Sequence, residues 1–258
     1  MTFDPRAAAV AIAAQHRNRE AFANLSGDLA PPTIDDAYDA QEALAETWVS
    51  ERGPVIGRKI ATTTRVMQEL MGIDHPCGGL IYQKTVHETG AALKRDTFVN
   101  VMIECELAVT LGQDLPAKSD AYTRDEVRAA VGTVMAAFEL IEDRNAVYKT
   151  SDARTLIADN AWNGGIVVGQ DVAVDRDFEL NALRGATMVN GRPHGEGLSD
   201  DPMGALAWVA NLAIARKQPM TQGMTVITGS LIPTFAVEAG DRIHFEIDHI
   251  GTVDLSIT

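Results

Sequence analysis

The stretch Ile103-Glu104-Cys105-Glu106-Leu107-Ala108-Val109 places two carboxylates inside a strongly apolar run. Alternate residues of a β-strand face the same side, so the two glutamates would lie roughly 6.5 Å apart along one face. Burying ionised carboxylates is costly unless a cation or hydrogen-bond donors compensate. Because apolar residues flank the pair, the stretch favours a buried strand that carries a charged site. A solvated strand face with two glutamates is the alternative.

A third carboxylate, Glu139, follows about one helix later in Phe138-Glu139-Leu140-Ile141. Together with Glu104 and Glu106 it would complete an all-oxygen site drawn from more than one element. Hard divalent cations prefer such oxygen donors. The sequence therefore predicts a divalent-metal centre at these three glutamates.

The composition limits the class of protein. The length of 258 residues and a hydrophobic content of 46% suit one large domain, or one domain with a helical appendage. A net charge of −14 argues against nucleic acid and anionic membrane surfaces as partners. The two cysteines, Cys77 and Cys105, form neither a metal-type pair nor a disulfide framework, which predicts a cytoplasmic protein.

Two further features bear on location. The alanine-rich segment 7–14 is interrupted by polar residues 15–17, so it predicts an amphipathic helix rather than a signal peptide. No stretch approaches the length of a membrane span.

The order of expected elements is helices first and then a β-rich body, which predicts an α+β fold. Capping signals predict helices from Thr33, with Asp36 three residues on, and from Thr123, with Glu126 three residues on. The expected helices are 4–24, 34–52, a turn after Thr63-Thr64, about 13 residues from Thr123 to near 136–137, and 202–216. The expected strands are 55–60, 97–112, 138–141, 166–168, 186–189, 224–228, 234–238, 242–248 and 252–257. Residues 72–80 are rich in glycine and proline and predict irregular structure.

Several familiar motifs of catalysis and nucleotide binding are missing from the sequence. It contains no G-x-S-x-G elbow, no P-loop, no G-x-G-x-x-G after a strand and no H-E-x-x-H. Nucleophilic hydrolysis by a serine therefore has no local signature.

Seven short motifs occur in an order that is informative as a set. They are Gly57-Arg58-Lys59-Ile60, Gly72-Ile73-Asp74-x-Pro76, Ile103-Glu104-Cys105-Glu106-Leu107-Ala108, Glu139 with Arg144, Ala158-Asp159-Asn160-Ala161, Thr228-Gly229-Ser230 and Ala239-Gly240-Asp241-Arg242. With these motifs the chain resembles the 2-keto-4-pentenoate hydratase and 4-oxalocrotonate decarboxylase branch of the fumarylacetoacetate hydrolase superfamily, over roughly residues 30–257.

The resemblance implies a mixed β-roll core with surrounding helices. It divides the chain into an N-terminal helical region, 1–53, and a catalytic domain, 54–258. It also implies Mg²⁺ or Mn²⁺ held by Glu104, Glu106 and Glu139. The implied substrate is a small 2-oxo or 2-hydroxy-2-ene carboxylate, bound through its C1 carboxylate and C2 oxygen. A homo-oligomer is implied as well.

Lys59 is the leading candidate for acid–base catalysis. It follows a short apolar strand, and the neighbouring Arg58 together with partial burial would lower the pKa of the lysine towards working pH. A lysine that only neutralises the carboxylate cluster is the alternative. Asp159 and Asn160 precede a glycine-rich turn, where they could cap the turn or hold substrate and a water molecule.

Other polar residues are candidates for substrate binding. Thr63, Thr228, Gly229 and Ser230 could donate hydroxyl or backbone N–H groups to the substrate carboxylate. The remaining candidates are departures from the pattern of the family: Cys77 begins Cys-Gly-Gly where relatives have Asp-Phe-Gly, Lys84 stands in place of an aspartate, and Trp162 with Asn163 replaces two small residues. These differences in charge and size predict a substrate with an extra carboxylate or an aromatic tail rather than the simple five-carbon diene.

The leading hypothesis is a lyase that adds water to a 2-hydroxydienoate and forms a 4-hydroxy-2-oxo acid, as in meta-cleavage aromatic catabolism. In it the metal binds the 2-oxo acid head, Lys59 moves the proton, and a water held near Asp159 and Asn160 attacks C4. Three alternatives stay open. They are decarboxylation of a 4-oxalocrotonate-type substrate, C–C hydrolysis with His75 or His87 on a lid, and a non-catalytic subunit that associates with a related hydratase or decarboxylase.

Overall fold

The computed structural model describes residues 3–258, which form six α-helices and thirteen β-strands. The helices are α1 (Pro5–Arg17), α2 (Ile34–Arg52), α3 (Arg65–Met71), α4 (Arg124–Ala130), α5 (Ala153–Ala158) and α6 (Pro202–Ala215). The strands are β1 (Val55–Ala61), β2 (Cys77–Tyr82), β3 (Val86–Glu88), β4 (Ala91–Leu93), β5 (Val101–Leu111), β6 (Val131–Glu142), β7 (Asn163–Val168), β8 (Val172–Ala173), β9 (Arg184–Val189), β10 (Arg192–Leu198), β11 (Thr225–Ala236), β12 (Arg242–Ile247) and β13 (Gly251–Ile257). The predicted α+β class is confirmed.

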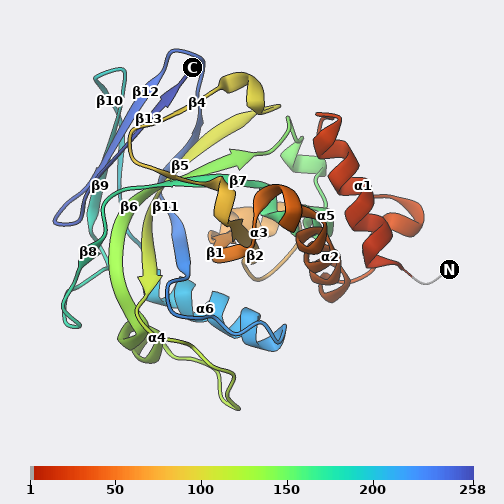
Figure 1. Cartoon of the computed structure of the whole chain (residues 1–258), viewed down its shortest axis with the longest axis horizontal. Coiled ribbons are helices and arrows are strands. Elements are labelled where there is room, and N and C mark those ends of the chain that lie inside the picture. Colours follow the sequence, from red (N-terminus) through yellow and green to blue (C-terminus); the bar gives the residue numbers. More distant parts are fainter. Residues whose placement is uncertain (1–2) are drawn as a thin grey trace.

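An eight-stranded mixed sheet carries the chemistry-bearing residues. Its order is β2-β1-β11-β5-β6-β7-β3, with β8 on β6. β1 runs parallel to β11, whereas β5 is antiparallel to both β11 and β6. Strands from the beginning, middle and end of the chain therefore lie next to one another, which Figure 1 shows for β1, β5, β6 and β11.

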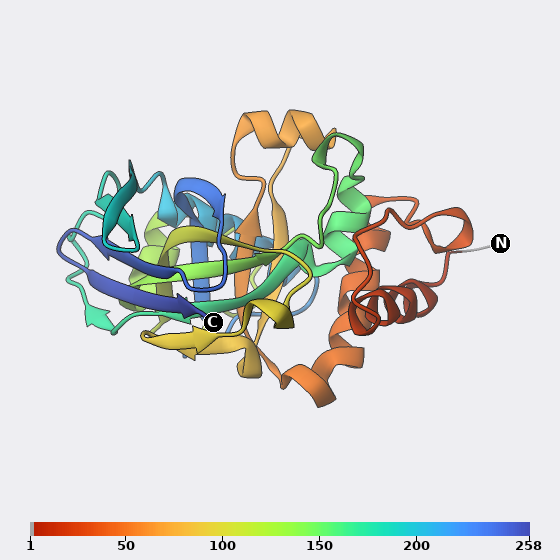
Figure 2. The ribbon, with the colours of Figure 1, turned by 90° about the horizontal axis from the view of Figure 1, so that it is seen from above.

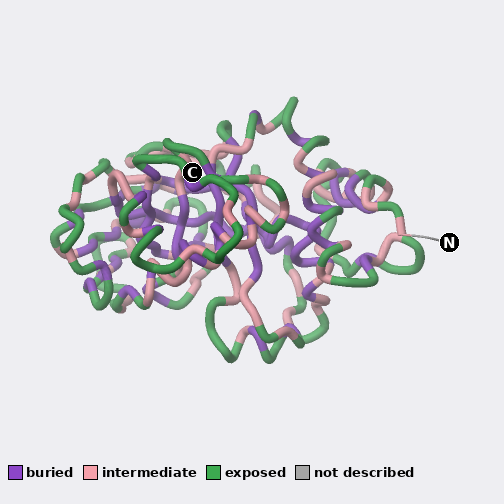
Figure 3. The backbone as a smooth tube through the Cα atoms, turned by 90° about the horizontal axis from the view of Figure 1, so that it is seen from below, coloured by how far each residue is buried: buried purple, intermediate pink, exposed green. Residues whose placement is uncertain are grey.

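A second sheet has five strands in the order β10-β9-β12-β13-β4. The main hydrophobic cluster joins it to the first sheet and to α6, and includes Leu107, Phe138, Phe245 and Val253, all fully buried. Figure 3 shows buried backbone running through the middle of this body and exposed backbone around its rim. The two curved sheets thus enclose one core, as the resemblance implies.

The N-terminal helices lie at the opposite end of the molecule from the second sheet (Figure 2). α2 begins with the predicted capping box between Thr33 and Asp36. The apolar faces of α1 and α2 share a buried cluster with Leu80 and Tyr82 of β2 and with Ala158 of α5. The division into regions 1–53 and 54–258 stays a prediction. No helix in residues 3–258 is both long and apolar enough to cross a membrane.

Several sequence predictions differ from the structure. α1 ends at Arg17, well before residue 24, and β11 is one strand from Thr225 to Ala236 rather than two. α4 begins at the predicted capping box but has only seven residues, because Val131 already pairs with β5. The segment Cys77–Tyr82 is a fully buried strand, although its glycines predicted irregular structure.

Candidate active site

The three glutamates meet because β5 and β6 are paired in register. Glu104 lies opposite Glu139 across the antiparallel ladder, and Glu106 follows two residues later on the same face. Carboxylate oxygens of the three residues all lie within 4.8 Å of one another. Glu106 and Glu139 are completely buried, and Glu104 is half-buried. Glu104 and Glu106, which the two-residue period of a strand puts on one face, therefore do lie together with Glu139 in the structure.

Each glutamate uses one carboxylate oxygen for a bond to the protein. Gly229 donates its N–H to Glu106 Oε2 at 2.7 Å, Asn163 donates from Nδ2 to Glu139 Oε1 at 2.7 Å, and the Thr234 hydroxyl donates to Glu104 Oε1 at 2.5 Å.

In each of the two buried carboxylates, the second oxygen is not used in a hydrogen bond among the residues that the structure describes. Within residues 3–258, Glu106 Oε1 and Glu139 Oε2 are buried and have no hydrogen-bond partner. Unsatisfied buried carboxylate oxygens are costly in a protein interior. A set of close, unpaired hard oxygen donors fits a divalent cation such as Mg²⁺ or Mn²⁺.

The electrostatics of the cluster without a cation are unfavourable. Burial, and then the neighbouring carboxylates, raise the pKa of Glu106 well above its ordinary value. Burial likewise raises the pKa of Glu139 to about 7, although Lys59 opposes the shift. Full ionisation of the three glutamates at neutral pH is therefore unfavourable in this site, although ordinary glutamates are ionised there.

A pH-dependent stability follows for metal-free protein. The pKa of the Glu139 carboxyl group is raised from its ordinary value of about 4.5 to about 7 in the folded protein. Such a group leaves the stability of the fold intact below its ordinary pKa. It destabilises the fold as the pH rises through the folded-state pKa. We expect the melting temperature in EDTA to fall between pH 5 and pH 8, and Mg²⁺ to reduce that fall. Scanning calorimetry of wild type and Glu139→Gln measures it; identical pH profiles for the two proteins would contradict the assignment.

Lys59 lies beside the cluster, on β1. Its side chain is 1% exposed, and Nζ lies 3.0 Å from Glu139 Oε1. Burial lowers the pKa of Lys59, but Glu139, Glu104 and Glu106 together outweigh burial, so the pKa is raised. The predicted lowering by Arg58 is wrong: that guanidinium lies on the other side of the strand, where it donates to the backbone and side-chain oxygens of Gln218.

A cavity of about 530 Å³ opens beside Lys59 and Glu104. Four predicted substrate-binding residues line it: Thr63, Trp162, Gly229 and Ser230. Its wall also contains residues that the sequence did not single out, namely Met67, Met71, Ile141, Tyr148, Leu156 and Thr234. They come from segments far apart in the sequence, including α3, β6, α5 and β11, and have no local motif, so only the fold brings them together. The cavity is charged at the glutamate end and largely apolar elsewhere.

An unusual turn places Trp162 and Asn163 at the site. Asn160, Ala161 and Trp162 have φ values of 54°, 47° and 57°, which is the left-handed region for three successive non-glycine residues. The Asn160 side chain fixes the turn by accepting from Leu80 N–H and donating to the Leu80 carbonyl. Trp162 then packs near Tyr148 at 5.1 Å between ring centroids, and Asn163 reaches Glu139.

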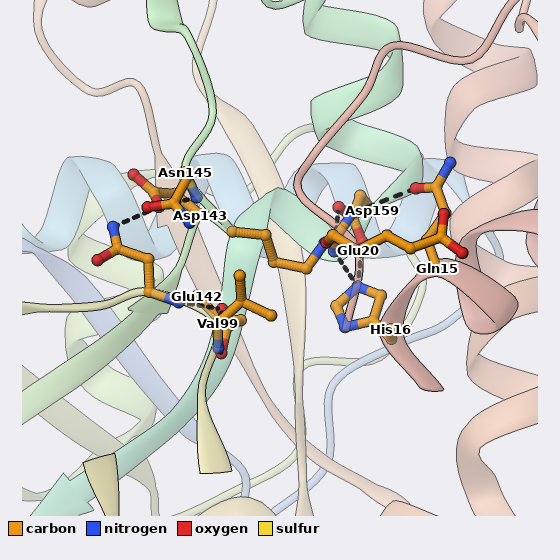
Figure 4. A network of polar contacts seen from close by, with 10 residues as sticks. Gln15, His16, Glu20, Val99, Glu142, Asp143, Asn145 and Asp159 are labelled. Atoms are coloured by element: carbon orange, nitrogen blue, oxygen red, sulfur yellow. Dashed lines mark hydrogen bonds and ion pairs between the residues drawn. The ribbon is translucent and has the colours of Figure 1, made fainter. Parts of the chain in front are cut away.

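Asp159 lies in a different network, shown in Figure 4. Its carboxylate lies 2.6 Å from His16 Nε2 and 2.8 Å from Arg144 Nη1, and it does not line the cavity. Asn160 likewise has its side chain committed to β2. The predicted role of Asp159 and Asn160 in holding the attacking water is therefore not supported by their positions, because both side chains have structural partners.

Four predicted substrate-binding residues do not line the cavity: Asn163, Thr228, Cys77 and Lys84. The Thr228 hydroxyl donates to the carbonyl of Leu107. Cys77 is fully buried, and burial raises the pKa of its thiol to about 11. Lys84 is exposed, and its Nζ donates to the Ser50 carbonyl at 3.3 Å. None of these side chains lines the cavity, so their position does not support the predicted contact with substrate, which stays a prediction.

The histidines considered for a C–C hydrolase are also elsewhere. His75 Nδ1 contacts the carbonyl of Pro76, and His87 lies on β3 at the edge of the first sheet. Neither lines the cavity. The hydrolase alternative therefore has no histidine at this site.

The fold and the carboxylate trio define a member of a known family. The fumarylacetoacetate (FAA) hydrolase C-terminal family profile matches residues 66–258. The chain belongs to the fumarylacetoacetate hydrolase family. It is 30% identical over 252 residues to 2-keto-4-pentenoate hydratase 1 of Dechloromonas aromatica (strain RCB), which covers 96% of this chain and 94% of that protein.

A second relative and a solved structure are also similar to this chain. 2-Hydroxyhexa-2,4-dienoate hydratase of Comamonas testosteroni is 30% identical over 248 residues, covering 94% of this chain and 93% of that protein. The structure of 4-oxalocrotonate decarboxylase from Pseudomonas putida G7, complexed with magnesium and adipate, superposes with a TM-score of 0.90 at 22% identity, covering 98% and 97% of the two chains. The predicted family and fold are confirmed.

Proposed function

We propose that this protein is a divalent-metal-dependent hydro-lyase that adds water to a 2-hydroxydienoate, or its 2-oxo-enoate tautomer, and forms a 4-hydroxy-2-oxo acid. The observation that carries the proposal is the carboxylate trio with two unpaired buried oxygens, beside Lys59 and at one end of an apolar cavity. The names of two relatives at 30% identity, both hydratases of 2-oxo or 2-hydroxy dienoic acids, support it.

Glu104, Glu106 and Glu139 would hold the cation, Mg²⁺ in our proposal. A bound divalent cation would polarise the C2 carbonyl of a chelating 2-oxo acid as a Lewis acid. Lys59 holds a proton at Nζ next to Glu139, where it can deliver that proton to the substrate carbon chain during ketonisation. The neutral amine that results can then accept a proton in a later step. The Gly229 N–H and the Asn163 amide fix the orientation of two carboxylates.

The test is a panel of 2-hydroxydienoates followed by ultraviolet absorbance with Mg²⁺, coupled to product mass. Hydration adds the mass of one water, whereas the alternative decarboxylation of a 2-oxo-enedioate releases CO₂. Loss of the diene absorbance with a hydrated product supports the proposal. Release of CO₂ from the enedioate without hydration of any diene would contradict it.

The cavity also indicates the class of the substrate tail. The charged residues that line it are Lys59 and Glu104, both at the metal end, and the rest of the lining includes the apolar side chains of Met67, Met71 and Trp162. A buried tail carboxylate would have no cationic partner there, which is costly. We therefore propose an apolar or aromatic tail, and not the extra carboxylate that Lys84 suggested from the sequence.

Substitutions at Trp162 and Lys84 test which of the two residues affects the choice of substrate. Trp162→Ser removes an indole from the wall, so the kcat/KM ratio between a phenyl-tailed and the five-carbon diene should change by about tenfold, as for a few buried methylenes. Lys84→Asp should leave that ratio unchanged, because Lys84 is exposed outside the cavity. The measurement is initial rates on both dienes for each variant. An effect of Lys84→Asp equal to that of Trp162→Ser would overturn the assignment.

Three further expectations stay predictions. They are a homo-oligomer, an association with a related decarboxylase or hydratase, and a cytoplasmic location suggested by two free, buried cysteines.

A further inference from the structure

A second cavity, of about 260 Å³, lies between α1, the end of α2 and the segment that leads into β5. Figure 4 shows part of its wall, including His16, Val99 and Glu142. It has no lining residue in common with the cavity at Lys59 among residues 3–258. The two cavities are therefore distinct, and the proposed reaction uses only the one at Lys59.

Four arginines line the second cavity: Arg17, Arg19, Arg52 and Arg144. Asp159 balances the charge of Arg144. Arg17 and Arg52 form neither an ion pair nor a side-chain hydrogen bond within the part of the chain that the structure describes. The Arg52 guanidinium carbon lies 3.4 Å from the centroid of the Trp48 ring, so the indole holds one face of the group. Its N–H edges stay free to bind an acceptor.

The acidic residues of the wall do not cancel these charges. Glu142 accepts hydrogen bonds from the backbone N–H groups of Val99 and Asn100 at 3.0 to 3.2 Å, so its carboxylate is already engaged. Glu51 is exposed. Because Asp159 already balances Arg144, three arginines against two glutamates leave the wall with a small excess of positive charge, in a chain whose net charge is −14. Such a local excess attracts small anions.

We propose that this cavity is a binding site for a short-chain organic carboxylate, separate from the substrate site. Guanidinium groups bind carboxylates through two parallel hydrogen bonds. Trp48, Phe98 and Ala13 add apolar wall beside the arginines, which suits the carbon body of an organic acid better than an inorganic anion. The cavity also borders Asn163, whose amide donates to the metal-ligand candidate Glu139. A bound acid would therefore adjoin a residue that orients the catalytic centre.

The test is isothermal titration calorimetry of EDTA-treated protein with succinate at low ionic strength. Because no metal and no turnover are involved, the result does not depend on the proposed hydratase activity. We expect one binding site, weakened about tenfold or more by Arg52→Gln, as for loss of a charge-assisted hydrogen bond. Arg17→Gln should weaken it in the same direction. The matched control is Arg65→Gln, at an exposed arginine on α3 that pairs with Glu69.

Two comparisons identify the site. Lys59→Met should leave succinate binding intact if the acid occupies the second cavity, and inorganic phosphate should bind more weakly than succinate. Circular dichroism checks that each variant is folded, and the exposed Arg17 provides a variant that tolerates substitution. Absence of binding, equal affinity in wild type, Arg52→Gln and Arg17→Gln, dependence on Lys59 instead, or tighter binding of phosphate would each overturn the proposal.

Discussion

Replacing Lys59 by methionine is expected to lower kcat by about 10²–10⁴-fold, the usual contribution of a general acid or base. Methionine keeps most of the buried volume and removes the ammonium group that lies 3.0 Å from Glu139. Metal affinity should stay the same or rise, because the ammonium group is a cation that competes for the same carboxylate. Steady-state kinetics and a metal titration by calorimetry measure the two effects separately.

The matched control is Lys94→Met, which changes an exposed lysine far from the cavity lining. It should leave kcat and metal affinity at their wild-type values. An unaltered kcat in Lys59→Met would assign Lys59 to a purely structural ion pair. A large loss of metal affinity together with kcat would instead indicate that the lysine acts through the position of Glu139.

Glu106→Gln is expected to have opposite effects on metal binding and on metal-free stability. The amide oxygen of glutamine can still accept from Gly229 N–H, but the other end becomes an uncharged NH₂ group where an unpaired oxygen now lies. Metal affinity should fall by at least about 100-fold, since even loss of an outer-shell partner costs 10–100-fold. The melting temperature in EDTA should rise by a few degrees, because one of three mutually repelling carboxylates is gone.

Scanning calorimetry with EDTA and with excess Mg²⁺ reveals both effects in one experiment. Wild type should gain stability on addition of the cation, and Glu106→Gln should gain little. Glu196→Gln, at an exposed residue of β10 that pairs with Arg184, is the control and should behave as wild type does. A variant that is destabilised in EDTA, and still stabilised by Mg²⁺ to the wild-type extent, would show that Glu106 is no ligand.

The helix caps and the carboxylate trio could be predicted because their signals are local. The capping boxes at Thr33 and Thr123 each depend on a residue three positions on, and Glu104 with Glu106 depends on the two-residue period of a strand. The end of α4 could not be predicted in the same way. Val131 begins a strand because β5 is available as a partner, which is a tertiary preference rather than a local one.

Strand β2 was missed for a related reason. A Cβ atom at Gly79 would lie 2.8 Å from Lys59 Cγ, and one at Gly78 would lie 2.5 Å from Leu212 Cδ2. Glycine is therefore required for close packing in a buried strand, whereas in sequence it resembles loop composition. The structural partners of Asp159 and Asn160 could not be read from the sequence for a similar reason. The contacts with Arg144 and Leu80 are formed only in the folded chain.

The order in which the strands meet has a consequence for synthesis on the ribosome. Lys59 lies on β1, whose parallel neighbour β11 begins at Thr225. At 5–20 residues per second, roughly ten seconds or more separate the emergence of these two strands. A comparable time separates α1 from one of its partners, since His16 of α1 contacts Asp159. Until β11 is made, β1 and β5 lack the strand that lies between them, so a stalled nascent chain exposes apolar surface there and has no complete catalytic centre. Chaperone demand should therefore last until β11, which begins at Thr225, has been made.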